Sequence, residues 1–511
     1  MSYLPSSLTA SATAFCVLAN TAYADLNPAE VWGDARANLE VMGYTVTATE
    51  ELLDGTLTVS DITLNSEANA NQQAVTISMG PLQFSQVNGG DVEVILPATM
   101  PVTIDMAATA LKRPARIEMS LTQSAQEILV SGDPDAMVFD YTADSFGLSL
   151  DTLTIDDKLY EADSARFLVS GENVQSQRKV IAGETRSYDQ SMQIDRVTYD
   201  VFFNDPAQVE ALQMTSTLEN ISFGGISKMP VGESTQSGDF STLLTAGFMF
   251  EGQFKTGTTE TQTEITSTDG TSKIKTGTEG TSLAIAMGQD GIRYDAQAQQ
   301  LQIGAQLAGL PFPLFAQMQR SGMSLSSPVQ KSDEPQDFAM SFDMTDFTMS
   351  DIIWALFDPS GQLPRDPATV AVDLSGKAKV LFDLFDPTSI EALTASGATP
   401  GELSALTLKR LELDAVGAKI NAQGDLTFDN SDKTTLPGFP KPVGAIDIDI
   451  AGANGLMDKL VAIGLLPAQQ VTGARLMLGL FAVPGATPDT LSSKIEFNEA
   501  GQILANGQRI K

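Results

Sequence analysis

Apolar and polar residues alternate along much of this chain, and few folds accept that pattern. The alternating segments include residues 75–79, 116–121, 197–203, 338–344, 410–414 and 446–450. A period of two places apolar side chains on one face of a β-strand and polar ones on the other. Strands of this kind form antiparallel sheets with one apolar and one solvated face. We therefore predict a mainly β fold of extended antiparallel sheets, arranged as a sandwich or an open groove.

Interruptions of the pattern carry further information. The alternation slips by one residue within residues 57–64, which predicts a β-bulge. A Thr-rich stretch, residues 255–281, is polar on both faces at its centre, and the sequence leaves open whether it forms an exposed hairpin or a linker. It divides the chain into an N-terminal β-rich region, residues 25–254, and a C-terminal β-rich region, residues 282–511.

A few short helices are expected among the strands. Asn27, Pro28 and Glu30 have the spacing of a capping box with a proline at the first helical position, and Gly43 is suited to end that helix. A second helix is expected after Ser350, and it should stop near Pro359. Residues 455–482 have helical spacing of apolar side chains in two arms, which predicts a C-terminal helical hairpin turning at Pro467.

The first residues have the pattern of a secretory signal peptide. An apolar run from Leu8 to Ala19 precedes Ala22-Tyr23-Ala24, an A-x-A cleavage site. No Lys or Arg lies before Leu8, so the natural start of the chain could lie further upstream. We expect cleavage after Ala24 and a periplasmic or secreted protein. Cys16, the only cysteine, would leave with the signal, so the mature chain would be held together without disulfides.

Composition excludes several classes of function. The chain has 511 residues, with 30 Lys and Arg against 64 Asp and Glu, a net charge of −34, and no histidine. Without histidine the chain has no imidazole side chain to act as a general base or to bind a metal ion. The acidic excess disfavours nucleic acid, because phosphate binding needs clustered Lys and Arg. After Asp25 no apolar run approaches the roughly 18 residues of a membrane-spanning helix. We expect no transmembrane span, cofactor or metal in the mature chain.

Two patterns that could carry catalysis are better explained by chance. Ser176 and Lys179 match the S-x-x-K motif of penicillin-binding proteins, and two K-T-G copies begin at Lys255 and Lys275. That chemistry needs the serine at a helix start with the lysine one turn later, whereas the flanking residues here favour strand or loop. The S-D-N motif of those enzymes is absent.

Paired carboxylates are the remaining candidates. Asp447 and Asp449 share one strand face, and Asp133 and Asp135 would do so if extended; such pairs could serve a glycosidase or a calcium site. The favoured interpretation is a solvated strand face, because the sequence lacks a calcium-loop motif. The two tryptophans, Trp32 and Trp354, lie in expected helices and are interpreted as core residues. We predict no catalytic, cofactor-binding or metal-binding residue.

Three stretches of the chain resemble the bacterial family known as domain of unknown function 2125. The resemblance is carried by residues 24–46, 351–369 and 460–509, which include Pro28-Ala29-Glu30-Val31-Trp32, Trp354-Ala355-Leu356-Phe357-Asp358-Pro359 and Leu504-Ala505-Asn506-Gly507. Membership would imply an exported protein of Gram-negative bacteria and supplies no activity. A weaker likeness, in the Gly-punctuated strands of residues 411–428, is to the AsmA-type envelope proteins with a β-groove.

A long sheet with one apolar face must be covered by another sheet, by helices or by a ligand, and few helices are expected here. The sequence therefore predicts an exported, non-enzymatic cell-envelope protein that binds a hydrophobic ligand, such as a lipid, on an apolar sheet surface. The alternative is a structural or protein-interaction module of the envelope that has no ligand.

Overall fold

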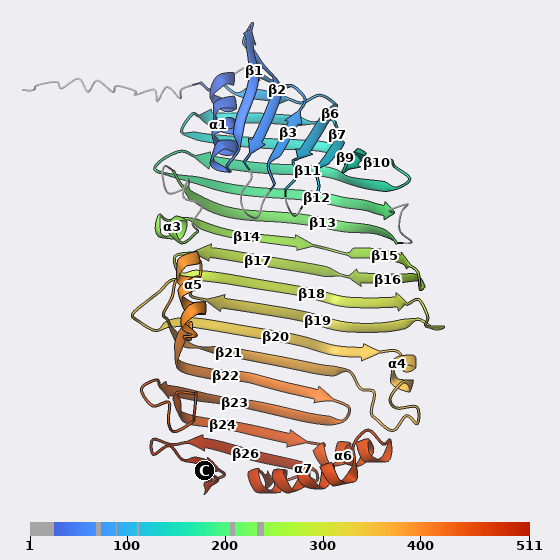
Figure 1. The fold of residues 1–511 in the computed structure, drawn as a ribbon, viewed down its shortest axis with the longest axis vertical. Helices are drawn as coiled ribbons and strands as arrows, with labels where there is room; N and C mark the ends of the chain where they lie inside the picture. Colours follow the sequence, from blue (N-terminus) through green and yellow to red (C-terminus); the bar gives the residue numbers. More distant parts are fainter. Residues whose placement is uncertain (1–24, 68–72, 88, 110–111, 205–209, 232–239) are drawn as a thin grey trace, which may run out of the picture.

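The computed structural model describes residues 25–67, 73–87, 89–109, 112–204, 210–231 and 240–511. The expected signal peptide, residues 1–24, lies outside these ranges. Nearly all of the described chain is built into one antiparallel sheet whose strands follow one another in chain order down the long axis of the molecule (Figure 1). The mainly β, antiparallel prediction is confirmed, and the strands form one continuous sheet instead of the two facing sheets of a sandwich.

The first half of the sheet is made of β1 to β13. Their bounds are β1 Thr45–Leu53, β2 Thr56–Ser66, β3 Val75–Met79, β4 Leu82–Gln86, β5 Val92–Ile95, β6 Thr99–Met106, β7 Ala115–Ser124, β8 Glu127–Asp133, β9 Ala136–Ile155, β10 Lys158–Tyr160, β11 Ala165–Ile181, β12 Thr185–Asn204 and β13 Ala211–Pro230.

The second half continues with β14 to β28. Their bounds are β14 Met249–Thr256, β15 Thr259–Ser267, β16 Gly270–Thr278, β17 Gly280–Gly288, β18 Gly291–Gln306, β19 Leu314–Ser327, β20 Gln336–Met349, β21 Ala368–Val380, β22 Gly401–Ala415, β23 Ala418–Asp429, β24 Lys441–Ala451, β25 Val483–Pro484, β26 Thr490–Phe497, β27 Ile503–Ala505 and β28 Gln508–Arg509.

Most strands pair with their neighbours in sequence. From β9 the order runs through β11 and β12 to β13. β13 pairs with both β14 and β15, β14 pairs with β17, β15 pairs with β16, and β17 pairs with β18. The order then continues from β18 to β24, β26, β27 and β28. Within the Thr-rich stretch, β15 and β16 form a hairpin that also pairs with β13 and β18. The predicted bulge in residues 57–64 is confirmed, because the β1–β2 register shifts opposite this segment and Asp61 has φ +52°.

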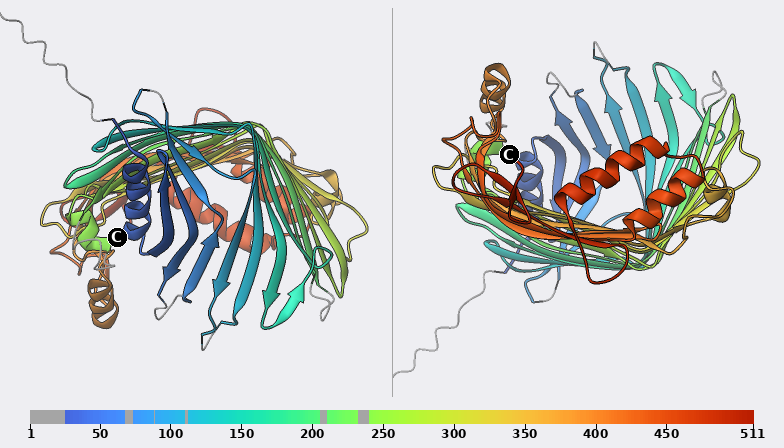
Figure 2. Two further views of the ribbon diagram at one scale, coloured as in Figure 1. Left: turned by 90° about the horizontal axis from the view of Figure 1, so that it is seen from above. Right: turned by 90° about the horizontal axis from the view of Figure 1, so that it is seen from below.

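A line of interrupted pairing, which we call the crease, crosses the strands near their middles. It includes residues with left-handed backbone on separate strands, Asn173 on β11, Asn220 on β13, Gln300 on β18 and Asp346 on β20, with φ between 51° and 53°. The pairing registers place Asn173 and Asn220 opposite the same unpaired residue of β12, Asp195. Such interruptions bend strands, and Figure 2 shows a strongly curved sheet.

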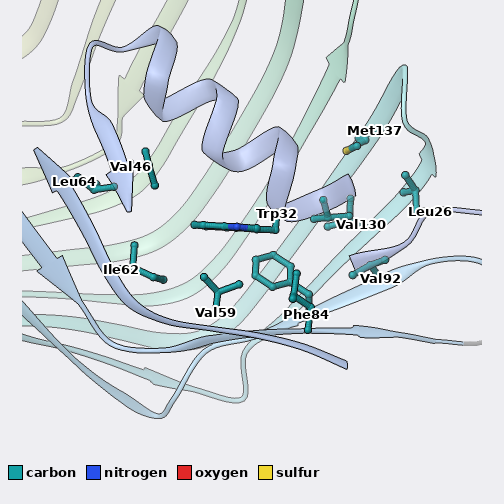
Figure 3. Close-up of a cluster of buried hydrophobic side chains, with 12 residues drawn as sticks. Leu26, Trp32, Val46, Val59, Ile62, Leu64, Phe84, Val92, Val130 and Met137 are labelled. Atoms are coloured by element: carbon teal, nitrogen blue, oxygen red, sulfur yellow. The ribbon is translucent and has the colours of Figure 1, made fainter. Parts of the chain in front are cut away.

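The N-terminal end of the sheet is closed by helix α1, Pro28–Val41. Its predicted capping box is confirmed: Asn27 accepts from the Glu30 N–H at 3.1 Å, and the Glu30 carboxylate accepts from the Asn27 N–H at 2.9 Å. Trp32, 4% exposed, packs against Phe84 with ring centroids 6.0 Å apart (Figure 3). Strands β1, β2, β4, β5, β8 and β9 supply most of the rest of this core, as predicted for a tryptophan interpreted as core.

The remaining helices of the described chain follow β13. They are α3 Phe240–Thr245, α4 Asp351–Ala355, α5 Pro387–Ser396, α6 Ala453–Ala462 and α7 Ala468–Phe481. Helices α6 and α7 form the C-terminal pair on either side of Pro467 and lie within the curve of the sheet (Figure 2). No described helix combines the length and the apolar character needed to cross a bilayer. Neither α3 nor α5 was predicted from the sequence.

Candidate functional site

One face of the sheet is apolar across nearly its whole length, and we call it the apolar face. Residues paired across antiparallel strands point to the same side. A single row of paired residues on this face runs from β8 to β24: Ile128, Tyr141, Ser176, Met192, Phe223, Phe254, Leu283, Ala296, Met323, Phe342, Val372, Leu411, Ala422 and Ile448. Ser176 is its one strongly polar member.

The neighbouring row faces the other way and is mainly polar. It consists of Asp140, Gln177, Ser191, Gly224, Gln253, Ala284, Asp295, Ser324, Ser341 and Asp373. The two rows differ by one residue along each strand, so the sheet separates apolar from polar side chains. The polar face meets solvent, and the apolar face is the surface whose cover has to be identified.

The crease does not interrupt the apolar face. On β9 the apolar positions shift from Tyr141 and Ala143 before the crease to Phe146 after it, and on β12 from Ile194 to Val197. Side chains from both sides pack against one buried cluster of Ala143, Val174, Ile194 and Ile221. At the crease, a residue with left-handed backbone or the unpaired residue opposite it shifts the apolar–polar alternation by one position. Apolar side chains therefore stay on the same side of the sheet.

The apolar face lies on the concave side of the sheet. Helix α1 lies against it at one end, where the Tyr188 hydroxyl donates to Asn38 Oδ1 at 2.8 Å and Arg186 of β12 forms an ion pair with Asp34. At the other end Ser493, the strand partner of Ile448, donates its hydroxyl to the Phe481 carbonyl at the end of α7. Figure 2 shows α1, α6 and α7 within the curve of the sheet.

Between these ends a part of the apolar face is open. Five of its side chains are substantially exposed, and we call them the open patch: Tyr294 (36%), Met323 (46%), Met340 (40%), Phe342 (42%) and Leu413 (41%). Met323 is paired with Phe342 on β20, so these two side chains are direct neighbours. Both buried apolar clusters of the described chain lie within residues 26–254. The open patch therefore has no comparable cover from the described residues.

One rim of the apolar face is covered by α4 and the loop after it. Trp354, 8% exposed, lies 5.2 Å from Phe357 between ring centroids. Beneath them is a cavity of about 210 Å3, bounded mainly by apolar side chains: Phe347, Met349, Trp354, Phe357, Ala368 and Ala415. Trp354 was predicted to be a core residue; it is buried, and it also forms a wall of this cavity.

A fully buried carboxylate, Asp358, holds that loop. Its oxygens accept from the backbone N–H groups of Leu363 at 2.8 Å and Gln362 at 3.0 Å. Burial by itself raises the pKa of Asp358, but these backbone hydrogen bonds, the Ser360 hydroxyl and the charge of Arg365 outweigh burial and lower the pKa below its usual value. Asp358 therefore stays ionised at neutral pH, and its hydrogen bonds hold the loop in this conformation.

The structure does not assemble the candidate catalytic motif. Ser176 and Lys179 lie three residues apart on strand β11 and so point to opposite faces, where the lysine cannot contact the serine. Lys255 is the second-to-last residue of β14, and Lys275 of β16 forms an ion pair with Glu260. The expectation that this match arose by chance agrees with these positions.

The paired carboxylates also stay apart from any site. Asp447 and Asp449 lie on the polar face of β24 and are exposed, as expected for a solvated strand face. Asp133 accepts from the backbone N–H of Asp135 at 3.0 Å and so shapes the β8–β9 turn. Within the described ranges no three Asp or Glu side chains gather as metal ligands would.

Sequence reasoning identified the apolar strand faces and missed two parts of the site. The open patch depends on register, which decides that Met323 and Phe342 meet. The cavity depends on the α4 loop; its only sequence signal is Asp358, an acidic residue placed to accept from N–H groups four and five residues later. The Asx-Pro pair at Asp358-Pro359 indicated the end of a helix and nothing more.

Comparison with known families assigns the second half of the chain. No protein with curated annotation matches the sequence significantly. The profile of one family, described as "Uncharacterized protein conserved in bacteria (DUF2125)", matches residues 253–505. This range contains the whole open patch, the α4 loop and the C-terminal helices. The looser likeness to AsmA-type proteins stays a prediction. The match over residues 253–505 confirms the resemblance of this chain to the DUF2125 family of uncharacterised bacterial proteins.

Proposed function

We propose that this chain is an exported, non-enzymatic envelope protein that binds a hydrophobic ligand, a lipid or another long apolar molecule, on the open patch. The observation that carries the proposal is the exposure of five large apolar side chains on the concave side of the sheet. Contiguous exposed apolar surface marks binding sites in soluble proteins. The signal-like N-terminus supports export, and the mature protein would begin at Asp25.

The residue types of the open patch suit a flexible apolar ligand that has no fixed shape. Methionine supplies two of the five side chains, and its flexible thioether adapts to irregular apolar surfaces. Tyr294 and Phe342 add flat aromatic area. No charged residue belongs to the patch, so hydrophobic burial would dominate the binding free energy, and selectivity for a headgroup would be weak.

The proposal is tested with the mature chain purified without detergent. Native mass spectrometry is expected to show co-purified apolar molecules, and N-phenyl-1-naphthylamine, a neutral apolar dye, is expected to bind. Met323→Glu and Phe342→Glu should each weaken dye binding by about tenfold or more, since burying such a side chain contributes roughly 1.5–3 kcal/mol.

Ser326→Glu is the matched control. It places the same charge on β19, on the polar face, where Ser326 is paired with Arg293. This variant should bind the dye as the parent does. Equal loss in all three variants, or no dye binding by the parent, would contradict the proposal.

The rival function is a structural or protein-interaction module of the envelope. It predicts no co-purified small molecule and a cross-linked protein partner whose capture depends on Phe342. Turnover of a substrate by the purified chain, with loss on replacing one Ser or Asp, would contradict the non-enzymatic part of the proposal.

A further inference from the structure

We infer that the cavity beneath α4 receives the apolar end of a chain-like ligand, while the rest of that ligand lies along the open patch. This inference rests on the proposed function and adds where the ligand ends and in which direction it lies. It follows from the volume and the lining of the cavity, its position beside the open patch and the charges at its mouth.

The volume and the lining fit the end of an apolar molecule and not a whole one. Drug-sized ligands occupy pockets of roughly 300–1,000 Å3, whereas this cavity has about 210 Å3. An apolar protein cavity of about 150 Å3 stays dry and accepts benzene. Phe347, Met349, Trp354 and Phe357 surround the space with carbon and sulfur, so a few methylene groups fit it chemically.

The cavity continues the open patch along two strands. On β22, Leu413 of the patch is followed on the same face by Ala415 of the cavity wall. On the neighbouring β21, Val370 is paired with Leu413, and Ala368 is paired with Phe347 of β20. A linear chain lying over Phe342 and Leu413 is therefore directed toward Trp354 without leaving apolar surface.

Charge at the cavity mouth favours a neutral end. Arg365 forms an ion pair with Asp351 and lies over the Trp354 ring, 5.7 Å from its centroid. Asp366 also borders the cavity. With its charge already opposed by a carboxylate, Arg365 is a poor partner for an anionic headgroup, and we place the headgroup at the far end, over the patch.

The test uses Trp354 as a reporter. The chain has two tryptophans, so Trp32→Phe leaves Trp354 as the only one. Bromine quenches indole fluorescence at contact, and two neutral probes place it at opposite ends of the same chain: 16-bromohexadecan-1-ol and 2-bromohexadecan-1-ol. We expect strong quenching by the 16-bromo probe and little by the 2-bromo probe at equal occupancy, measured by displacement of N-phenyl-1-naphthylamine.

The outcomes separate this inference from the proposed function. If both probes displace the dye and quench Trp354 equally, or not at all, the inference is wrong and the proposed function stands. If neither probe nor dye binds, both are wrong.

A second variant tests the cavity without relying on fluorescence. Ala415→Phe fills the cavity, and Ala339→Phe places the same ring on the polar face as a control. In the parent and the control, affinity for straight-chain alcohols should rise by up to about fourfold per added methylene. In Ala415→Phe this gain should stop several methylenes earlier, and an unchanged dependence on chain length would overturn the inference.

Discussion

At the scale of single residues, a few polar groups determine the local geometry of an otherwise apolar site. Asp358 is the clearest case, because it is fully buried and is satisfied almost entirely by the backbone N–H groups of its own loop. A buried carboxylate without such partners would be strongly destabilising. The loop therefore adopts its conformation only together with the hydrogen bonds to Asp358, and the folded loop holds Trp354 in place.

The depressed pKa of Asp358 predicts a pH dependence with a definite sign. Its stabilising contribution is fully present above the ordinary carboxyl pKa of about 3.9 and is lost as the pH falls through the lower folded value. Asp358→Asn should lower the melting temperature at pH 7, and the difference from the parent should shrink as the pH falls below the ordinary carboxyl pKa. Melting curves between pH 2 and 7 in the Trp32→Phe background, followed by Trp354 emission, measure both.

Other acidic groups with lowered pKa, such as Asp432 and Asp489, titrate equally in the parent and the variant, so they cancel in the comparison. A difference in melting temperature that stays constant from pH 7 to pH 2 would show that the Asp358 charge contributes nothing to loop stability.

At the scale of elements, helix α1 is attached to the sheet by an enclosed ion pair. Asp34 of α1 and Arg186 of β12 have side chains only 8% and 13% exposed. Nearby, Tyr188 donates to Asn38, one turn further along the helix. Because both side chains are shielded from water, replacing one of them would leave the other charge buried and unpaired, which destabilises the folded state.

Removing one partner is therefore expected to be costly. Asp34→Ala should lower the free energy of unfolding by about 3–5 kcal/mol, and Asp34→Leu combined with Arg186→Met should recover most of that loss. Lys377→Ala, which breaks an exposed pair with Asp337, should cost at most about 1 kcal/mol. Urea unfolding followed by circular dichroism measures all three, and equal losses for Asp34→Ala and Lys377→Ala would contradict the assignment.

The elements also show how far the sequence could predict this fold. Helix α1 was predictable because Asn27, Pro28 and Glu30 give its start locally, and the strands were predictable because each carries its own alternation. Helix α5 had comparable signals, Asp386 as N-cap and Gly397 at the end, but its short apolar pattern has no buried side chain to confirm it. The crease was not predictable, because Asn173 and Gln300 are unremarkable in sequence and acquire left-handed backbone only through alignment with their neighbours.

For the site, the sequence of each strand indicated its own apolar face. The surface that these faces form together could not be predicted from the separate strands. Which strand lies beside which, and whether a second sheet covers them, are properties of pairing. The open patch exists because β18 to β22 meet in register without comparable cover from the described chain, and the cavity exists because the α4 loop covers one rim of the same strands.

At the scale of the whole molecule, stability should decrease from the N-terminal end toward the middle of the sheet. The core around Trp32 and the cluster at the crease bury side chains to 0–7% exposure, whereas the open patch exposes 36–46%. Amides in regions with few buried apolar contacts exchange hydrogen faster.

Hydrogen exchange read by mass spectrometry checks this gradient. We expect slow exchange in β2, β9 and β11 and faster exchange in β19 to β22. Saturating N-phenyl-1-naphthylamine should slow exchange in β19 to β22 and leave β2 unchanged. The reverse order, or uniform protection by the dye, would contradict the proposed site of binding.

The chain-order pairing of the strands has a further consequence for how such proteins can vary. Because each hairpin contacts mainly the hairpins before and after it, one hairpin can be inserted or deleted without altering the pairing of the rest, as in repeat proteins. Thirteen successive pairings separate β9 from β26, which at roughly 4.8 Å each is a distance of roughly 60 Å. Gain or loss of a hairpin would change that reach in steps of about 10 Å, so small duplications or deletions would adjust the length of the sheet without altering the rest of the pairing.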